Sequence, residues 1–137
     1  MDELKNALEN QTNVSIIELT TKKIEKYKDS ILSELCLSKK KFLDIKKKLK
    51  KYRYCTDLKD IHYGYYIRYI PLKDPEKIHL TNGGVICDIK ILNNEIHILC
   101  KNNIGGLFQI KFDENIIFQK ITPQEKVILN VLDYLDK

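Results

Sequence analysis

The 137-residue sequence contains no tryptophan, one methionine and one alanine, and its four cysteines form no CxxC pair. The intervals between the cysteines, 19, 32 and 13 residues, match no zinc-finger or zinc-ribbon spacing. His97 and Cys100 are three residues apart, but on a strand they would point to opposite faces. We therefore expect no metal site. The cysteines are Cys36, Cys55, Cys87 and Cys100.

Long apolar runs are also missing, since no stretch approaches the roughly 18 residues that a membrane-spanning helix needs. The first ten residues, MDELKNALEN, are acidic and polar, unlike a secretory signal peptide. These absences predict an intracellular protein, cytoplasmic or nuclear and not secreted, with reduced thiols and no membrane partner.

Catalytic signatures are absent as well. The chain has no GxSxG, P-loop, GxGxxG or HExxH motif, and its histidines, His62, His79 and His97, are scattered. We therefore expect a non-enzymatic protein without a cofactor.

Lysine dominates what is present. The chain has 24 basic and 19 acidic residues, a net charge of +5, and only two of the basic residues are arginine. Abundant lysine, isoleucine and asparagine are typical of an A+T-rich genome, so much of the lysine reflects coding bias. However, Ser38–Tyr54 contains nine basic residues against one acid, Asp44, while the rest of the chain is nearly neutral. That local excess is larger than bias alone usually produces.

The first half lacks glycine and proline and has helical periodicity. Ser15 and Glu18 have capping-box spacing, which predicts a helix to about Leu35. A break at Leu37–Ser38 precedes a second helix, so we expect a helical hairpin. The second helix has one apolar stripe, formed by Phe42, Ile45, Leu49 and Tyr52. A further helical turn is expected at 57–61.

From Gly64 onward the period changes to two, and tight turns are indicated at Asn82-Gly83-Gly84 and Asn93-Asn94. This pattern predicts a five-stranded antiparallel meander that curls into a small SH3-like or OB-like barrel. Thr122-Pro123-Gln124-Glu125 then begins a C-terminal helix. The five strands are expected at 65–70, 85–92, 96–100, 107–112 and 116–121.

The expected fold class is therefore α+β, with three segments. Residues 1–62 form a basic helical hairpin, 63–121 a small β-barrel-like domain and 122–137 a docking helix. That helix packs on an open barrel end or on the hairpin, and we expect it to form one compact unit with 63–121.

The candidate site is a nucleic-acid-binding surface on the second helix, where lysines would contact phosphates with little base readout. Tyr66 and Arg68, on the strand face opposite Tyr65, could add a stacking surface. The alternatives are a solvated lysine face, and tyrosines that serve the core. The candidate residues are Lys39, Lys40, Lys46, Lys47, Lys48, Lys50, Lys51, Arg53, Tyr66 and Arg68.

Four segments carry a pattern-level resemblance, over about residues 40–120, to small uncharacterised proteins of large A+T-rich DNA viruses. The resemblance implies a viral origin and a small β-domain, and it brings no catalytic residues. The segments are GYYIRYI from Gly64, LTNGGV from Leu80, LFQIKF from Leu107 and IIFQK from Ile116.

Two functions remain open from the sequence. The first is a binding module that associates with nucleic acid through the lysine-rich helix. The second is a structural or assembly protein, a virion or complex subunit that packs on protein partners. In that case the stripe of helix 15–36 would form an oligomer interface, including one with further copies of the same chain.

Overall fold

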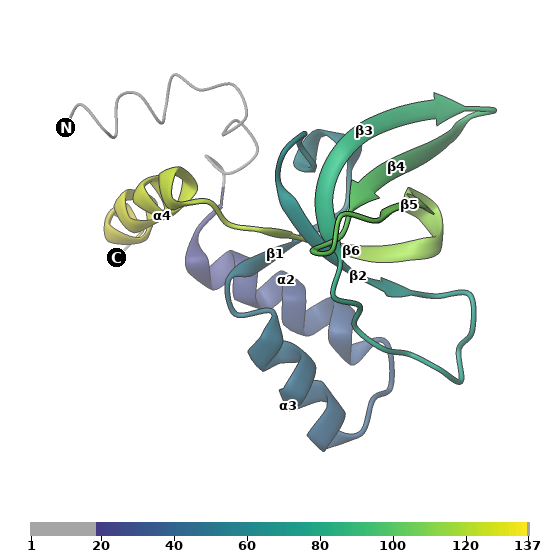
Figure 1. Cartoon of the computed structure of the whole chain (residues 1–137). Coiled ribbons are helices and arrows are strands. Elements are labelled where there is room, and N and C mark those ends of the chain that lie inside the picture. The colour runs from purple at the N-terminus through teal and green to yellow at the C-terminus, as the bar shows by residue number, and fades with distance from the viewer. Residues whose placement is uncertain (1–18, 137) are drawn as a thin grey trace. The chain divides into compact units, whose positions relative to one another are not determined.

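The computed structural model describes residues 19–136 and has an α+β architecture (Figure 1). The fold class is thus confirmed. The helices are α2 (Thr21–Ser33), α3 (Lys39–Lys48) and α4 (Pro123–Leu135). The strands are β1 (Tyr52–Cys55), β2 (Tyr66–Pro71), β3 (Gly84–Leu92), β4 (Glu95–Lys101), β5 (Leu107–Lys111) and β6 (Asn115–Lys120).

The chain divides into two compact units. One takes in the described residues up to Arg53 together with those from Ile121 on, and contains the three helices. The other, Tyr54–Lys120, contains β2 to β6. This division differs from the expected one, because the C-terminal helix groups with the N-terminal helices and not with the strands.

Helix α2 begins later than the sequence suggested. Thr20 is its N-cap, with a side chain that accepts a hydrogen bond from the backbone N–H of Lys23 at 3.2 Å. The polar pair Thr20-Thr21, which interrupts the apolar periodicity, is therefore the helix start. The capping box expected at Ser15–Glu18 lies outside the described residues.

Helix α4 packs on α2, and this contact explains its place in the helical unit. Ile24 of α2 forms a buried cluster with Ile128 and Leu129 of α4. At the start of α2, Thr21 donates two hydrogen bonds to the Asp133 carboxylate, from its backbone N–H at 2.8 Å and its hydroxyl at 2.6 Å. Part of the apolar face of α4, around Ile128 and Leu129, is thus covered by another helix.

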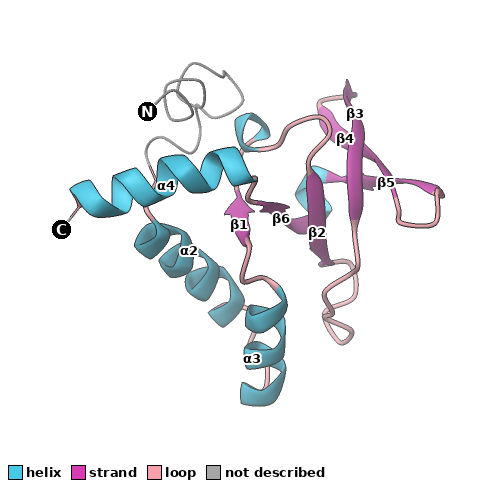
Figure 2. Cartoon of the chain, turned by 60° about the vertical axis from the view of Figure 1, so that its left-hand side comes forward, coloured by secondary structure: helices cyan, strands magenta, loops and turns pink. Residues whose placement is uncertain are grey.

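The sheet has six strands in the order β1-β6-β2-β3-β4-β5, and it is open (Figure 2). The expected five-stranded barrel is therefore wrong in strand number and in closure. The extra strand arises because Tyr52, expected on the second helix, begins β1 instead. Tyrosine has strong β propensity, and helix α3 already ends at its C-cap, Leu49.

Strands β3 and β4 form the long hairpin that was expected. Asn93 and Asn94, at its tip, have φ values of +53° and +65°, the left-handed region that a two-residue hairpin turn requires. The register shifts between Ile86 and Asp88, which leaves Cys87 as the extra residue of a β-bulge. The curvature of this hairpin is visible in Figure 1.

The core of the Tyr54–Lys120 unit is built from aliphatic side chains of neighbouring strands. Its buried cluster includes Ile67, Ile86, Ile98, Cys100 and Ile117. Burial raises the pKa of the Cys100 thiol to about 12, so this cysteine stays protonated and unreactive at neutral pH.

Among the residues described, no helix combines the length and apolar character that crossing a bilayer requires.

Gly83 is a position where only glycine fits. Its φ is +72°, and a Cβ atom there would overlap the backbone carbonyl oxygen of Ile67. We predict that Gly83→Ala lowers the free energy of unfolding by roughly 3 kcal/mol, measured by urea denaturation. Gly64→Ala is the matched control, with φ +82° but no atom within 4 Å of the added carbon. It should cost only the left-handed strain, about 1–2 kcal/mol. Equal losses in the two variants would contradict the steric argument.

Candidate nucleic-acid interface

Helix α3 is held at both of its ends by side chains of the helical unit. Ser38 caps its N-terminus by accepting a hydrogen bond from the backbone N–H of Lys41 at 3.2 Å. At its C-terminus, the ammonium group of Lys28 from α2 donates a 2.9 Å hydrogen bond to the carbonyl oxygen of Leu49. The same carbonyl also accepts a 3.0 Å hydrogen bond from the backbone N–H of Tyr52, so Lys28 is its second donor. A positive charge there also complements the helix dipole.

Lys28 itself is 1% exposed, and its charge is compensated inside the helical unit. The Nζ atom lies 2.8 Å from Oε1 of Glu25, one turn earlier on α2. A lone buried ammonium group would be costly, but here it has a carboxylate and a carbonyl as partners. The spacing of the apolar residues could have predicted that Lys28 is buried. Lys28 lies four residues from both Ile24 and Leu32, within the buried stripe of α2. The buried role of Lys28 was not predicted, because all of the lysines were expected at the surface.

A second interaction orients one flank of α3 toward α2. The Lys46 ammonium lies 2.6 Å from Oδ1 of Asp29 and 4.0 Å from Oε2 of Glu25. Lys46 was predicted as a phosphate contact, but the structure places it between two of the protein's own carboxylates. Lys48, another predicted contact, lies 3.1 Å from Oδ2 of Asp44. Both side chains of that surface pair are about half exposed, so the pair is weak.

The remaining lysines of this segment point to solvent. Two triplets, 39–41 and 46–48, are seven residues apart, which is almost exactly two helical turns. Lys40 and Lys47 therefore lie one above the other, opposite the buried stripe. Within residues 39–51, six exposed lysines have no ion pair with the part of the chain that the structure describes, and we call them the lysine face. They are Lys39, Lys40, Lys41, Lys47, Lys50 and Lys51.

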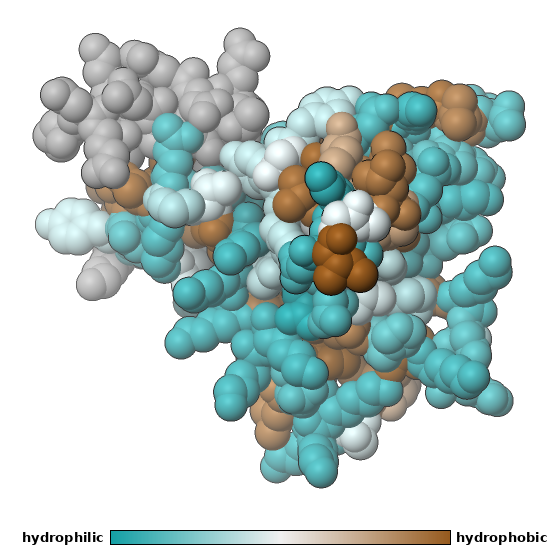
Figure 3. Space-filling model, viewed as in Figure 1, coloured by the Kyte–Doolittle hydropathy of each residue, from teal (hydrophilic) through white to brown (hydrophobic). Residues whose placement is uncertain are grey.

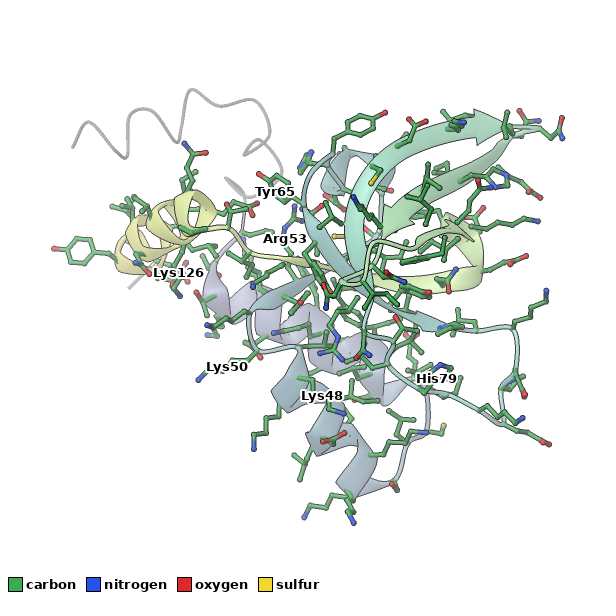
Figure 4. All side chains as sticks on the ribbon, viewed as in Figure 1. Lys48, Lys50, Arg53, Tyr65, His79 and Lys126 are labelled. Carbon is green, nitrogen blue, oxygen red and sulfur yellow. The ribbon has the colours of Figure 1, made fainter. Side chains whose placement is uncertain are left out.

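The lysine face continues past the end of the helix. Lys50 extends away from the ribbon (Figure 4). The backbone of Lys51 is fixed, since its carbonyl accepts a 2.8 Å hydrogen bond from the N–H of Ile121, while its side chain is exposed. The surface over α3 is mostly hydrophilic in Figure 3. Leu43, 54% exposed, is the large apolar residue of α3 at this surface.

Arg53 does not belong to this surface, so its predicted contact with phosphate is wrong. The side chain is 2% exposed, and its Nη2 atom lies 3.9 Å from Oε2 of Glu125, which is fully buried. Arg53 is the second residue of β1, and not an extension of the lysine-rich helix. Since Tyr52 continues the apolar spacing of that helix, Arg53 was expected on the helix as well, but both residues lie on β1.

Tyr66 and Arg68 lie in the other unit, and their polar groups are already engaged. The Tyr66 hydroxyl donates to the carbonyl oxygen of Asn82 at 2.6 Å, and Nε of Arg68 donates to that of Thr81 at 2.9 Å. Both side chains are partly buried. These hydrogen bonds hold the segment before β3 against β2, which is a structural role.

A second cluster of titratable groups lies around a hollow of about 350 Å³ in the Tyr54–Lys120 unit. Lys111 lies 3.3 Å from Glu95 and 3.8 Å from Glu114, and these carboxylates raise its pKa. The amide of Gln109 lies 2.9 Å from Nδ1 of His97. The charged groups are thus paired with one another. In residues 19–136, no group of three or more His, Cys, Asp or Glu side chains is arranged to hold a metal ion.

Comparison with known proteins adds no relative. No protein-family model, no curated protein and no solved structure matches the chain.

The capping role of Lys28 is testable by substitution. Lys28→Met keeps the buried stem but removes one of the two donors to the Leu49 carbonyl and the nearer of the two cations beside the Glu25 carboxylate. We expect the free energy of unfolding to fall by about 1–3 kcal/mol in urea denaturation. Lys26→Met, on the exposed side of α2, should change it by less than about 0.5 kcal/mol. A Lys28→Met variant as stable as the wild type would contradict the role.

The buried carboxyl group of Glu125 predicts a pH dependence. Burial raises its pKa above the ordinary value of 4.5, although the Thr122 hydrogen bonds and Arg53 act in the opposite direction. The folded chain therefore retains a proton at pH values where the unfolded chain has lost it. As pH rises above 4.5, this group lowers the stability of the fold, and the loss is complete above the folded-state pKa.

Glu125→Gln removes this titration and retains an oxygen for the N–H of Thr122. Below pH 4 the variant resembles the protonated wild type, so the two should unfold with similar free energies. The free energy of unfolding of the variant relative to the wild type should then increase between pH 4 and pH 8. Urea denaturation at a series of pH values measures it. A relative stability that falls with pH would show that the pairing with Arg53 outweighs burial.

Proposed function

We propose that this protein is a non-enzymatic binding module that associates with nucleic acid through the lysine face of α3. The observation that carries the proposal is the set of six exposed, unpaired ammonium groups within residues 39–51. A helix end capped by Lys28 and a flank tied to Asp29 support it, because they hold α3 so that Lys40 and Lys47, on the side opposite its buried stripe, face solvent.

The distribution of charge also supports the proposal. The Tyr54–Lys120 unit contains eight basic and eight acidic residues, so the net charge of +5 comes entirely from residues 1–53 and 121–137. If coding bias alone explained the lysines, both units would be expected to be basic. The concentration on one unit, and there on one helix, favours an anionic partner.

Phosphate contacts by lysine give a binding energy that depends strongly on salt. Each neutralised phosphate releases condensed counterions, so the binding constant falls steeply as salt increases. Contacts of this kind typically yield dissociation constants of about 10⁻⁴–10⁻⁶ M at physiological salt. We expect an affinity in this range.

The second candidate function is that of an assembly subunit, and exposed apolar side chains on the Tyr54–Lys120 unit favour it. Ile104 is 92% exposed and Leu107, at the start of the end strand β5, is 66% exposed. The interface first expected on α2 is occupied in part, because Ile24 is already packed against α4. Both functions are compatible with the viral origin that we propose from the resemblance in sequence pattern.

Charge removal tests the proposed function. We predict that the variant with Lys40, Lys47, Lys50 and Lys51 all changed to Gln loses most of its affinity for a labelled oligonucleotide. Fluorescence anisotropy over a salt series measures it. For the wild type on a duplex, log K should fall with log salt at a slope of about −5, and loss of four of the six contacts should reduce that slope to roughly −2.

The matched control removes the same number of charges from the other unit. Lys73, Lys77, Lys101 and Lys120 are exposed lysines of the Tyr54–Lys120 unit, and their change to Gln should leave affinity and salt slope near those of the wild type. Absence of wild-type binding to single-stranded and to duplex oligonucleotides at low salt would overturn the proposal. That outcome would favour the assembly function.

A further inference from the structure

We infer that the lysine face takes double-stranded nucleic acid, held by its phosphate backbone without sequence preference. This inference rests on the proposed function and specifies its substrate. It follows from which side chains the lysine face offers and which it lacks, and from how far apart its charges lie.

The face has no group that reads bases by hydrogen bonding. Residues 39–51 are lysine, leucine, isoleucine, phenylalanine and a single aspartate. Sequence-specific contacts in a groove depend largely on arginine, asparagine and glutamine, which bind base edges through two hydrogen bonds. The aspartate, Asp44, is paired with Lys48. The nearest arginine, Arg53, is buried beside Glu125. Lysine, a point charge on a flexible stem, contacts phosphates without reading sequence.

The face also has no aromatic surface on which unpaired bases could stack. Phe42, the one aromatic residue of this segment, is partly buried on the side of the apolar stripe. Tyr27 is exposed on α2, but it lies on the flank away from Asp29 and Glu25, and hence away from α3. Proteins that bind single strands gain about 1–3 kcal/mol for each base stacked on an aromatic side chain. This energy is not available on the lysine face, so a single strand has no advantage there.

The lysine face can still distinguish nucleic acids by the density of their phosphate charge, and this density favours the duplex. Lys40 and Lys47 are seven residues apart, which separates them by about 10 Å along α3. A duplex has one phosphate for about every 1.7 Å of its axis, against one per 3.4 Å for a single strand. The lysine face therefore lies beside a higher density of negative charge on a duplex than on a single strand. Counterion release per contact is also greater there, with a factor of about 0.9 against about 0.7.

The test compares four labelled probes of equal length with the full chain at a fixed low salt concentration. They are oligo(dT), an A+T-rich DNA duplex, a G+C-rich DNA duplex and an RNA duplex. We expect both DNA duplexes to bind at least about fivefold more tightly than oligo(dT), as their higher charge density requires. The two DNA duplexes should differ by less than about twofold, since no base is read. The RNA duplex should also bind more tightly than oligo(dT), because it too carries the phosphates of two strands.

The outcomes separate this inference from the proposed function. Equal or tighter binding of oligo(dT) would overturn the duplex preference while leaving nucleic-acid binding in place. A difference of more than tenfold between the two DNA duplexes would overturn sequence independence. Binding of none of the four probes would overturn the proposed function itself. The Lys40, Lys47, Lys50 and Lys51 to Gln variant should lose affinity for all probes, which assigns the binding to the lysine face.

Discussion

The buried ammonium group of Lys28 connects the two helices on which the candidate site depends. It lies between the Glu25 carboxylate on its own helix and the Leu49 carbonyl at the end of α3. This arrangement stabilises the C-terminal end of α3 at Leu49, shortly before β1 begins at Tyr52. Because a buried charge is tolerated only with such partners, the position of α3 relative to α2 is closely specified.

That constraint sorts the lysines into two groups with different roles. Lys28 and Lys46 are used inside the helical unit, where they pair with Glu25 and Asp29. The lysine face consists of the exposed lysines of this segment that form no such ion pair. Lysine ammonium groups therefore hold α3 against α2 on one side and, in our proposal, bind nucleic acid on the other. The Tyr54–Lys120 unit has no net charge, so the excess of positive charge is confined to the rest of the chain.

Local signals predicted local structure well. The helix that starts after the break at Leu37–Ser38, the helix that starts at Thr122–Glu125 and the turn at Asn93-Asn94 are all present as expected. Each depends on side chains and backbone within a few residues, so short-range pattern contains the necessary information. The errors were of a different kind. Tyr52 continued the helical stripe at the right spacing, yet it begins a strand, because spacing alone does not exclude β structure when a helix can end nearby.

From its amino-acid order alone, the chain determined its α+β class, most element boundaries and the concentration of lysine in 39–51. Those properties follow from composition, periodicity and capping, which act over a turn or two of backbone. Only the tertiary structure decided which charges are available. Arg53 and Lys46 resemble their neighbours in sequence, but Glu125 and Asp29, which are distant along the chain, take them out of solvent-facing roles. The openness of the sheet was decided at the same level, since closure depends on whether its end strands, β1 and β5, meet.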